Sequence, residues 1–255
     1  TLESLYPGRV ELGLGRAPGT DQMTARALRR DLLGSDDRFP QDVRELQHYF
    51  GPIQEGQSVK AIPGANTNVP IWILGSSLYG AQLAAHFGLP YAFASHFAPE
   101  QLLHAMAAYR ELFKPSDELA KPYCGFVMNV VAADTDEDAA HLFTTLQQNV
   151  IRMRRNTRGQ LPPPIENLDQ FCEPHEKNTA AQALRCSAVG SLETVRKEMQ
   201  YWLDQTGANE IIITGQIHDH QARLRSFEIA AEADPALGSG RRQREFAQCC
   251  RIDLR

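Results

Sequence analysis

The chain has 255 residues, of which 42% are hydrophobic and 22% charged, and its formal net charge is −5 at pH 7. These values are typical of one globular domain with a large buried core. The negative charge, together with basic residues that form no long face, argues against a nucleic-acid-binding role. The longest strongly apolar stretch, residues 125–133, is about half the roughly 20 residues that a membrane-spanning helix needs, so no span is predicted.

The termini and cysteines point to a reducing compartment. No secretory signal pattern is visible at the start of the sequence, so we expect a cytoplasmic protein. The cysteines are Cys124, Cys172, Cys186, Cys249 and Cys250. They have neither metal-ligand spacing nor the density of a disulfide-rich secreted domain, and we predict reduced thiols and no metal site.

Predicted strands and helices alternate along the chain. Apolar runs predict strands over residues 9–15, 69–74, 91–94, 123–132 and 210–214, most of them apolar on both faces, as a buried parallel sheet requires. Capping residues and apolar periodicity predict a helix that Thr20 and Asp21 cap and that runs to residue 33. The same signals predict helices over 41–50, 77–87, 99–113, 136–155, 193–205 and 219–231. This alternation predicts an α/β fold.

Two of the predicted strands end in loops suited to an anion. The first strand is followed by Arg16, whose guanidinium is permanently charged and carries five donors. The second ends in Gly75, Ser76 and Ser77, where the free N–H groups and dipole of the next helix favour a phosphate. Two other interpretations remain open: Arg16 could form a rim salt bridge, and the serines could cap the helix.

Together, the Arg16 loop (residues 12–21) and the serine turn (residues 71–80) resemble the bacterial-luciferase-like flavin monooxygenases. The resemblance runs from residue 1 to about residue 233. It implies a TIM-type (β/α)8 barrel in which Arg16, Ser76 and Ser77 hold the phosphate of FMN. Leu74, Gly75 and Tyr79 would be further cofactor-binding residues along the phosphate or ribityl chain, although a tyrosine at this place is also typical of a core. At Gly80 the luciferases proper carry a hydroxyl residue, so this chain offers one donor fewer.

The number of strands raises a question about the barrel. A closed barrel of this kind has eight strands, and the sequence predicts five. Residues 1–9 resemble the region just before the fourth strand of the family. We therefore expect the first three strands to be missing from this chain or to come from another polypeptide, because an open remnant exposes two apolar edges.

The resemblance also sets the expected domain organisation. Residues 1–237 would form a partial barrel, and residues 238–255 a tail that leaves the family pattern. Residues 156–177 lose periodicity and carry a proline-rich run, at the place of the family's insertion near the seventh strand. We expect this segment to be either an active-site lid or a surface linker.

His96 is the candidate catalytic residue. It follows the predicted strand at 91–94, on the face where barrel enzymes keep their chemistry. The alternative is a hydrogen-bonded rim histidine without a role in the reaction.

By resemblance, the function is that of an FMN-dependent monooxygenase that uses reduced flavin and O₂ on a small organic substrate. A flavin reductase would supply the reduced FMN, and the chain would form a homodimer. Other branches of the family use F420 or take hydride from NAD(P)H. The alternatives are a non-catalytic flavin-binding or structural partner subunit with a shortened barrel, and a phosphosugar-type barrel enzyme. The last should show a lysine or paired carboxylates at strand ends, which this sequence does not.

Overall fold

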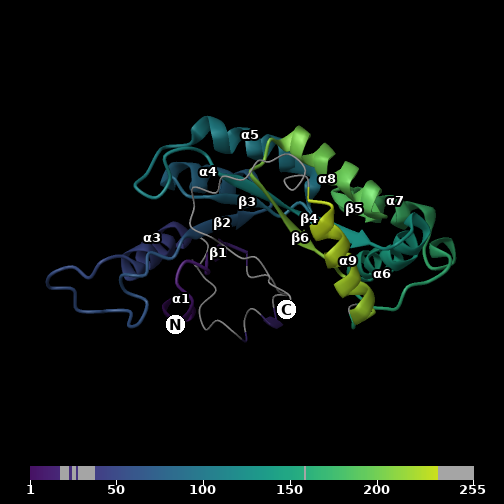
Figure 1. Cartoon of the computed structure of the whole chain (residues 1–255), viewed down its shortest axis with the longest axis horizontal. Helices are drawn as coiled ribbons and strands as arrows, with labels where there is room; N and C mark the ends of the chain where they lie inside the picture. The colour runs from purple at the N-terminus through teal and green to yellow at the C-terminus, as the bar shows by residue number, and fades with distance from the viewer. Residues whose placement is uncertain (18–22, 25–26, 28–37, 158, 235–255) are drawn as a thin grey trace.

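A parallel sheet organises the chain, as the computed structural model shows for residues 1–17, 23–24, 27, 38–157 and 159–234 (Figure 1). Every strand pair is parallel, which confirms the predicted α/β class. The strands of this part of the chain are β1 (Leu12–Gly15), β2 (Ile71–Gly75), β3 (Tyr91–Phe93), β4 (Cys124–Ala132), β5 (Ser187–Gly190) and β6 (Glu210–Thr214).

Helices connect the strands, as parallel pairing requires. The described helices are α1 (Leu2–Leu5), α3 (Phe39–Phe50), α4 (Leu78–Phe87), α5 (Leu102–Leu112), α6 (Asp136–Arg154), α7 (Pro174–Ala183), α8 (Leu192–Thr206) and α9 (His220–Glu232), with 3₁₀ turns η1 (Pro99–Gln101) and η2 (Leu168–Gln170). Most of the helix expected from Thr20 and Asp21 to residue 33 lies outside the described residues; residues 23, 24 and 27, which are described, are helical. No described helix has both the length and the apolar character needed to cross a membrane.

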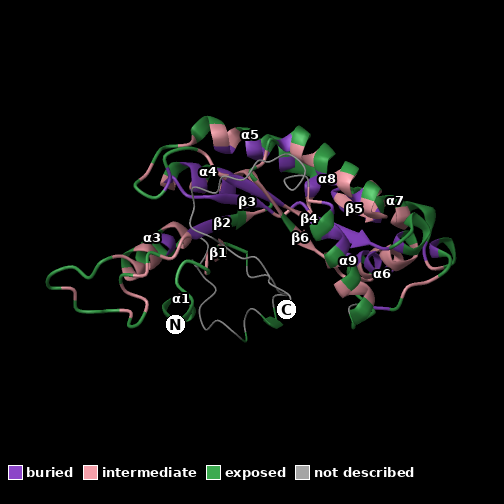
Figure 2. Cartoon of the chain, viewed as in Figure 1, coloured by how far each residue is buried: buried purple, intermediate pink, exposed green. Residues whose placement is uncertain are grey.

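The nine-residue strand β4 is the centre of the sheet. The strand order runs from β1 through β2 and β3 to β4. On β4, residues 125–129 pair with β6, and residues 129–132 pair with β5. Alternate β4 side chains, among them Phe126 and Met128, are fully buried against the helices. In Figure 2, buried segments are concentrated in β2, β3, β4 and β5 and in the helices that cover them, whereas β1 and β6 contain only intermediate and exposed residues.

The other face of the sheet is less covered. Leu74 on β2 and Ile212 on β6 are exposed by 37% and 39%, respectively. Their strand neighbours Ile73 and Ile211 pack in the main core, as expected because successive side chains point to opposite faces. The described part of β1 pairs on one side only, with β2. The closed eight-stranded barrel and the missing first strands therefore stay predictions.

Two elements correct the sequence-based expectation. β5 was not among the five predicted strands, because four residues of small and partly buried side chains give little apolar signal. Helix α7 begins at Pro174, inside the segment 156–177 that was expected to be irregular. Leu168 and Cys172 from this segment pack with Ile151 of α6 in a second apolar cluster. The segment thus lies against α6, and its role as a lid stays a prediction.

Candidate functional site

The ends of three neighbouring strands bring the predicted site residues to one edge of the sheet. Gly15 of β1 lies opposite Leu74 of β2, so Arg16 and the serine turn leave the sheet at the same level. The amide of Ala94, just after β3, donates to the carbonyl oxygen of Gly75 at 2.8 Å. The turn that carries His96 therefore starts beside the serine turn. In parallel α/β folds, this carboxyl edge is where ligands bind.

The guanidinium of Arg16 stacks on an aromatic ring. Its Cζ lies 4.3 Å from the centroid of the Tyr79 ring, at the start of α4. Among the described residues, no carboxylate lies within ion-pair distance of Arg16, whereas Arg155, Arg196 and Arg225 each have such a partner. The rim salt bridge that we considered for Arg16 thus finds no partner in this part of the chain. A cation that finds no counter-ion among the described residues and lies beside a helix start is suited to an anion.

The first turn of α4 leaves its donors available. Ser77 is the N-cap residue, with extended backbone, and its side chain makes no capping hydrogen bond. The first turn contains no acidic residue. In α6, by contrast, Thr135 accepts from the amide of Asp138, and three acids occupy the first turn. An anion at α4 would therefore meet free amides and two serine hydroxyls without repulsion.

Two glycines set how closely this turn approaches the sheet. A side chain on Gly75 would lie 3.5 Å from the Cα of Gly80, and the reverse distance is the same. The backbones of β2 and α4 therefore touch at this point. Leu74, Gly75, Ser76, Ser77 and Tyr79 all stand on this short segment, so the structure brings the predicted cofactor residues together with Arg16.

His96 lies just after β3, in the turn before η1. Its Nδ1 is buried without a hydrogen-bond partner among the described residues. Burial lowers the pKa of the imidazole, which favours the neutral ring at pH 7. The ring packs edge-on against Phe97, which is 52% exposed, with centroids 4.6 Å apart. A neutral imidazole here can donate or accept a hydrogen bond.

Asn129 is a residue that the sequence-based prediction missed. It lies within β4, is 1% exposed, and donates from Nδ2 to the carbonyl oxygen of His96 at 2.7 Å. Its Oδ1 has no partner in the described part of the chain. The signal was present in the sequence, because Asn129 is a polar residue in the middle of an apolar strand, and buried amides need partners.

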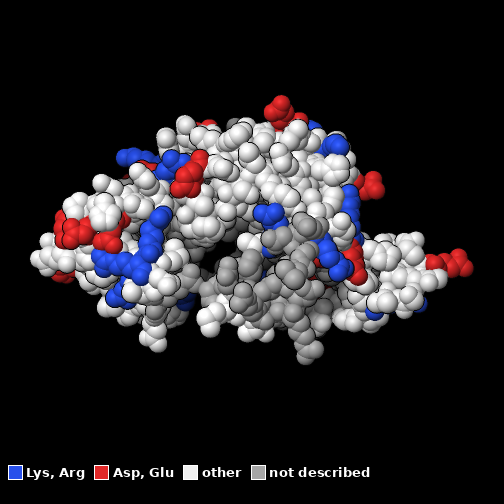
Figure 3. Space-filling model, turned by 180° about the vertical axis from the view of Figure 1, so that it is seen from behind, with Lys and Arg blue, Asp and Glu red and all other residues white. Residues whose placement is uncertain are grey.

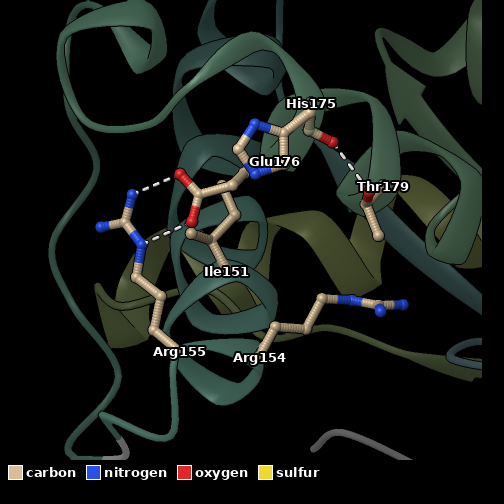
Figure 4. A pocket seen from close by; sticks show the side chains of 6 residues that line it. All are labelled: Ile151, Arg154, Arg155, His175, Glu176 and Thr179. Carbon is tan, nitrogen blue, oxygen red and sulfur yellow. Dashed lines mark hydrogen bonds and ion pairs between the residues drawn. The ribbon is translucent and has the colours of Figure 1, made fainter.

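A separate cavity lies between α6 and α7, away from these strand ends. Its volume is about 230 Å³, and it is lined by Ile151, Arg154, Arg155, His175, Glu176 and Thr179. Figure 4 shows Arg155 paired with Glu176 at its side, while Arg154 points in another direction. Arg155 Nε donates to Glu176 Oε1 at 2.7 Å and Nη2 to Oε2 at 2.5 Å. The ion pair joins the two helices, and the cavity contains none of the predicted site residues.

This ion pair predicts a pH dependence of stability. The hydrogen bonds from Arg155 lower the pKa of Glu176 to about 2 from 4.5, so the ionised form is favoured in the folded state. The stability that it contributes is present above about pH 4.5 and is lost as the pH falls toward 2. Glu176→Gln should therefore flatten the fall of unfolding free energy between pH 4.5 and 2, as measured by urea denaturation. Glu111→Gln, on the exposed side of α5, should leave that fall unchanged.

The face of the molecule seen in Figure 3 carries charges of both signs. On this face, acidic and basic side chains lie near one another. Among the residues with defined positions, no three His, Cys, Asp or Glu side chains gather as a metal site. The cysteines in this part of the chain, Cys124, Cys172 and Cys186, are buried and free.

Known proteins resemble this chain over most of its length. The family model described as luciferase-like monooxygenase matches residues 1–210. A luciferase-like monooxygenase of Escherichia coli (strain K12) is 52% identical over 237 residues, which are 93% of this chain and 71% of that protein. The uncharacterized protein YvbT of Bacillus subtilis (strain 168) is 46% identical over 233 residues, 91% of this chain and 69% of its own.

Solved structures share the fold. The crystal structure of apo-MsnO8 has a TM-score of 0.82 and 32% identity, and covers 91% of this chain and 70% of its own. An F420-dependent secondary alcohol dehydrogenase has a TM-score of 0.60 at 14% identity, again over 91% of this chain and 70% of its own. The second likeness concerns the fold alone.

Proposed function

Since the chain belongs to the family of luciferase-like monooxygenases, we propose that it uses reduced FMN and O₂ to oxygenate a small organic substrate. The observation that carries the proposal is the environment of the Arg16 guanidinium. Its charge has no carboxylate partner among the described residues and stacks on Tyr79, at the start of a helix without acidic residues in its first turn. This arrangement supports binding of a phosphate group.

The residues at the edge of the sheet would divide the work of cofactor binding. Arg16, Ser76 and Ser77 bind the phosphate through charge, hydroxyls and free amides. Leu74 and Gly75 line the path from the phosphate toward the sheet, where Leu74 exposes an apolar surface. When bound, the flavin supplies the reaction with O₂, and the protein supplies orientation and a site from which water is excluded.

His96 is proposed to contact the substrate. Its turn is hydrogen-bonded to the serine turn through Ala94 and Gly75, and burial keeps the imidazole neutral. A neutral ring can donate a hydrogen bond to a substrate carbonyl or accept one from a substrate hydroxyl, and it becomes an imidazolium when it takes up a proton from that hydroxyl.

Replacing His96 separates this role from cofactor binding. His96→Phe should lower turnover about 100-fold or more, as expected when a group that transfers a proton is removed. FMN affinity should stay within about twofold, because the imidazole acts on the substrate and not on the phosphate. Steady-state oxygenation and FMN titration measure the two effects. Equal turnover of variant and parent protein would assign His96 to the rim.

The cofactor itself is tested by a parallel titration. FMN and riboflavin share the ring system and differ in the phosphate, so a phosphate site predicts tighter binding of FMN. Fluorescence quenching of both flavins on the purified chain measures the difference. Equal affinities would contradict the proposed site. A titration with F420 on the same sample tests the deazaflavin alternative, and an assay with NAD(P)H tests direct hydride use. Homodimer formation, supply by a flavin reductase and a cytoplasmic location stay predictions.

A further inference from the structure

We propose that Tyr79 is a positioning residue for the phosphate site, and that it acts through Arg16. Its ring holds the guanidinium beside the first turn of α4, so that the positive charge and the free amides of the helix face the same anion. The inference rests on the proposed flavin function. It assigns to Tyr79 a contact with the arginine, in place of a wall contact with the cofactor.

The need for a positioning residue follows from the arginine side chain. A free arginine populates many rotamers, and fixing it in one of them costs conformational entropy. Arg16 is exposed and has no ion pair among the described residues. Its contact with the Tyr79 ring at 4.3 Å therefore restricts the guanidinium. Stacking on an aromatic face uses the flat side of the guanidinium and leaves the N–H donors at its edge available to a ligand.

The backbone of Tyr79 is well anchored. Tyr79 is the second residue of α4 and is half-buried. The helix start is fixed to β2 by the backbone contact of Gly75 with Gly80, and Gly80 is buried against the Tyr91 ring. The Cα atom that carries the ring therefore keeps its place at the helix start. Its position relative to the amides is thus set by the fold before any ligand binds.

The aromatic face, and not the hydroxyl, is the feature that the contact uses. No hydrogen bond of the Tyr79 hydroxyl occurs within the described residues, whereas buried Tyr109 donates from its hydroxyl to the carbonyl oxygen of Leu89. Phenylalanine should therefore replace Tyr79 without loss of FMN affinity, because it keeps the aromatic face. Leucine should lower the affinity, because it is similarly apolar but has no π system.

The same helix offers a matched control. At its other end, Arg44 stacks on Phe87 with its Cζ 4.0 Å from the ring centroid. Tyr79 and Phe87 are eight residues apart, about 12 Å along the helix axis. Phe87→Leu therefore removes a similar cation–π contact from α4 at a place remote from the serine turn.

The experiment is a titration of the full chain with FMN and with riboflavin, for the parent protein and for Tyr79→Leu, Tyr79→Phe and Phe87→Leu. Tyr79→Leu should weaken FMN binding about 3- to 20-fold, the range expected for a cation–π contact. Tyr79→Phe and Phe87→Leu should stay within about twofold. Riboflavin should bind equally to all four proteins. Adding Tyr79→Leu to Arg16→Ala should weaken FMN binding no further, because the tyrosine acts through the arginine.

Three results would overturn the inference. Parent-like FMN affinity of Tyr79→Leu would mean that the ring does not position Arg16. Equal losses for FMN and riboflavin would make Tyr79 a wall residue or indicate a damaged fold, which thermal unfolding of the variant distinguishes. Additive losses in the double variant would show two independent contacts. If the parent protein bound FMN and riboflavin equally, the proposed phosphate site would itself be contradicted. In that case Arg16→Ala would also leave the preference for FMN over riboflavin unchanged.

Discussion

Arg16→Ala should weaken FMN binding by about 1.5 to 3 kcal/mol, which is about 10- to 150-fold in affinity. The size follows from the loss of a charge-assisted contact to a phosphate, which is stronger than a contact between neutral groups. The described surroundings offer no second cation paired to the same aromatic ring, so we expect no compensation in this part of the chain. Flavin titration by fluorescence quenching measures the change.

Controls make this result specific to the phosphate. Riboflavin lacks the phosphate, so its affinity should not respond to Arg16→Ala. Arg44→Ala removes an arginine of α3 that stacks on Phe87 at the other end of α4, and it should not change the affinity for either flavin. The loss for FMN should shrink at high salt, because screening weakens the exposed part of the contact. A loss that is equal for both flavins would place Arg16 against the ring system.

Met128→Ala should lower the free energy of unfolding by about 2 to 5 kcal/mol. Met128 is fully buried in the middle of β4, the strand that pairs with β3, β5 and β6. Truncation leaves a cavity that the central strand cannot close, because its backbone is bonded to strands on both sides. Urea denaturation followed by circular dichroism measures the change.

Met153 provides the matched control for this substitution. It lies in the last turn of α6 and is 47% exposed, so Met153→Ala removes the same atoms from a place near solvent. We expect a change within about 0.5 kcal/mol there. Similar losses at Met128 and Met153 would contradict the assignment of β4 as the centre of the core.

The sequence predicted most of the elements with their boundaries within a few residues. Five predicted strands correspond to β1, β2, β3, β4 and β6. Side-chain caps are present at two of the predicted helices: Thr135 accepts from the amide of Asp138, and Asp219 accepts from that of Ala222. These signals are local, since periodicity and capping involve residues within one or two turns.

The elements that the prediction missed depend on distant partners. The last residues of β4 extend beyond the end of β3, and β5 pairs with them there, so β5 depends on the backbone hydrogen bonds that this part of β4 offers. Helix α7 is held by packing on α6 and by the pair of Arg155 with Glu176. Four weakly apolar residues, or a helix with little amphipathic pattern, give no local signal strong enough to predict them.

For the candidate site, too, some features were predicted from the sequence and others are visible only in the tertiary structure. The sequence by itself determined the α/β class, through the alternation of strands and helices. Strand ends, glycines and serines determined the family resemblance and the loops that carry Arg16, Ser76, Ser77 and His96. Only the tertiary structure decided that Arg16 stacks on Tyr79, 63 positions later in the chain, and that Asn129 holds the carbonyl oxygen of His96. The reason is physical: strand register and helix packing set which side chains meet, and both result from long-range burial rather than from the residues near each position.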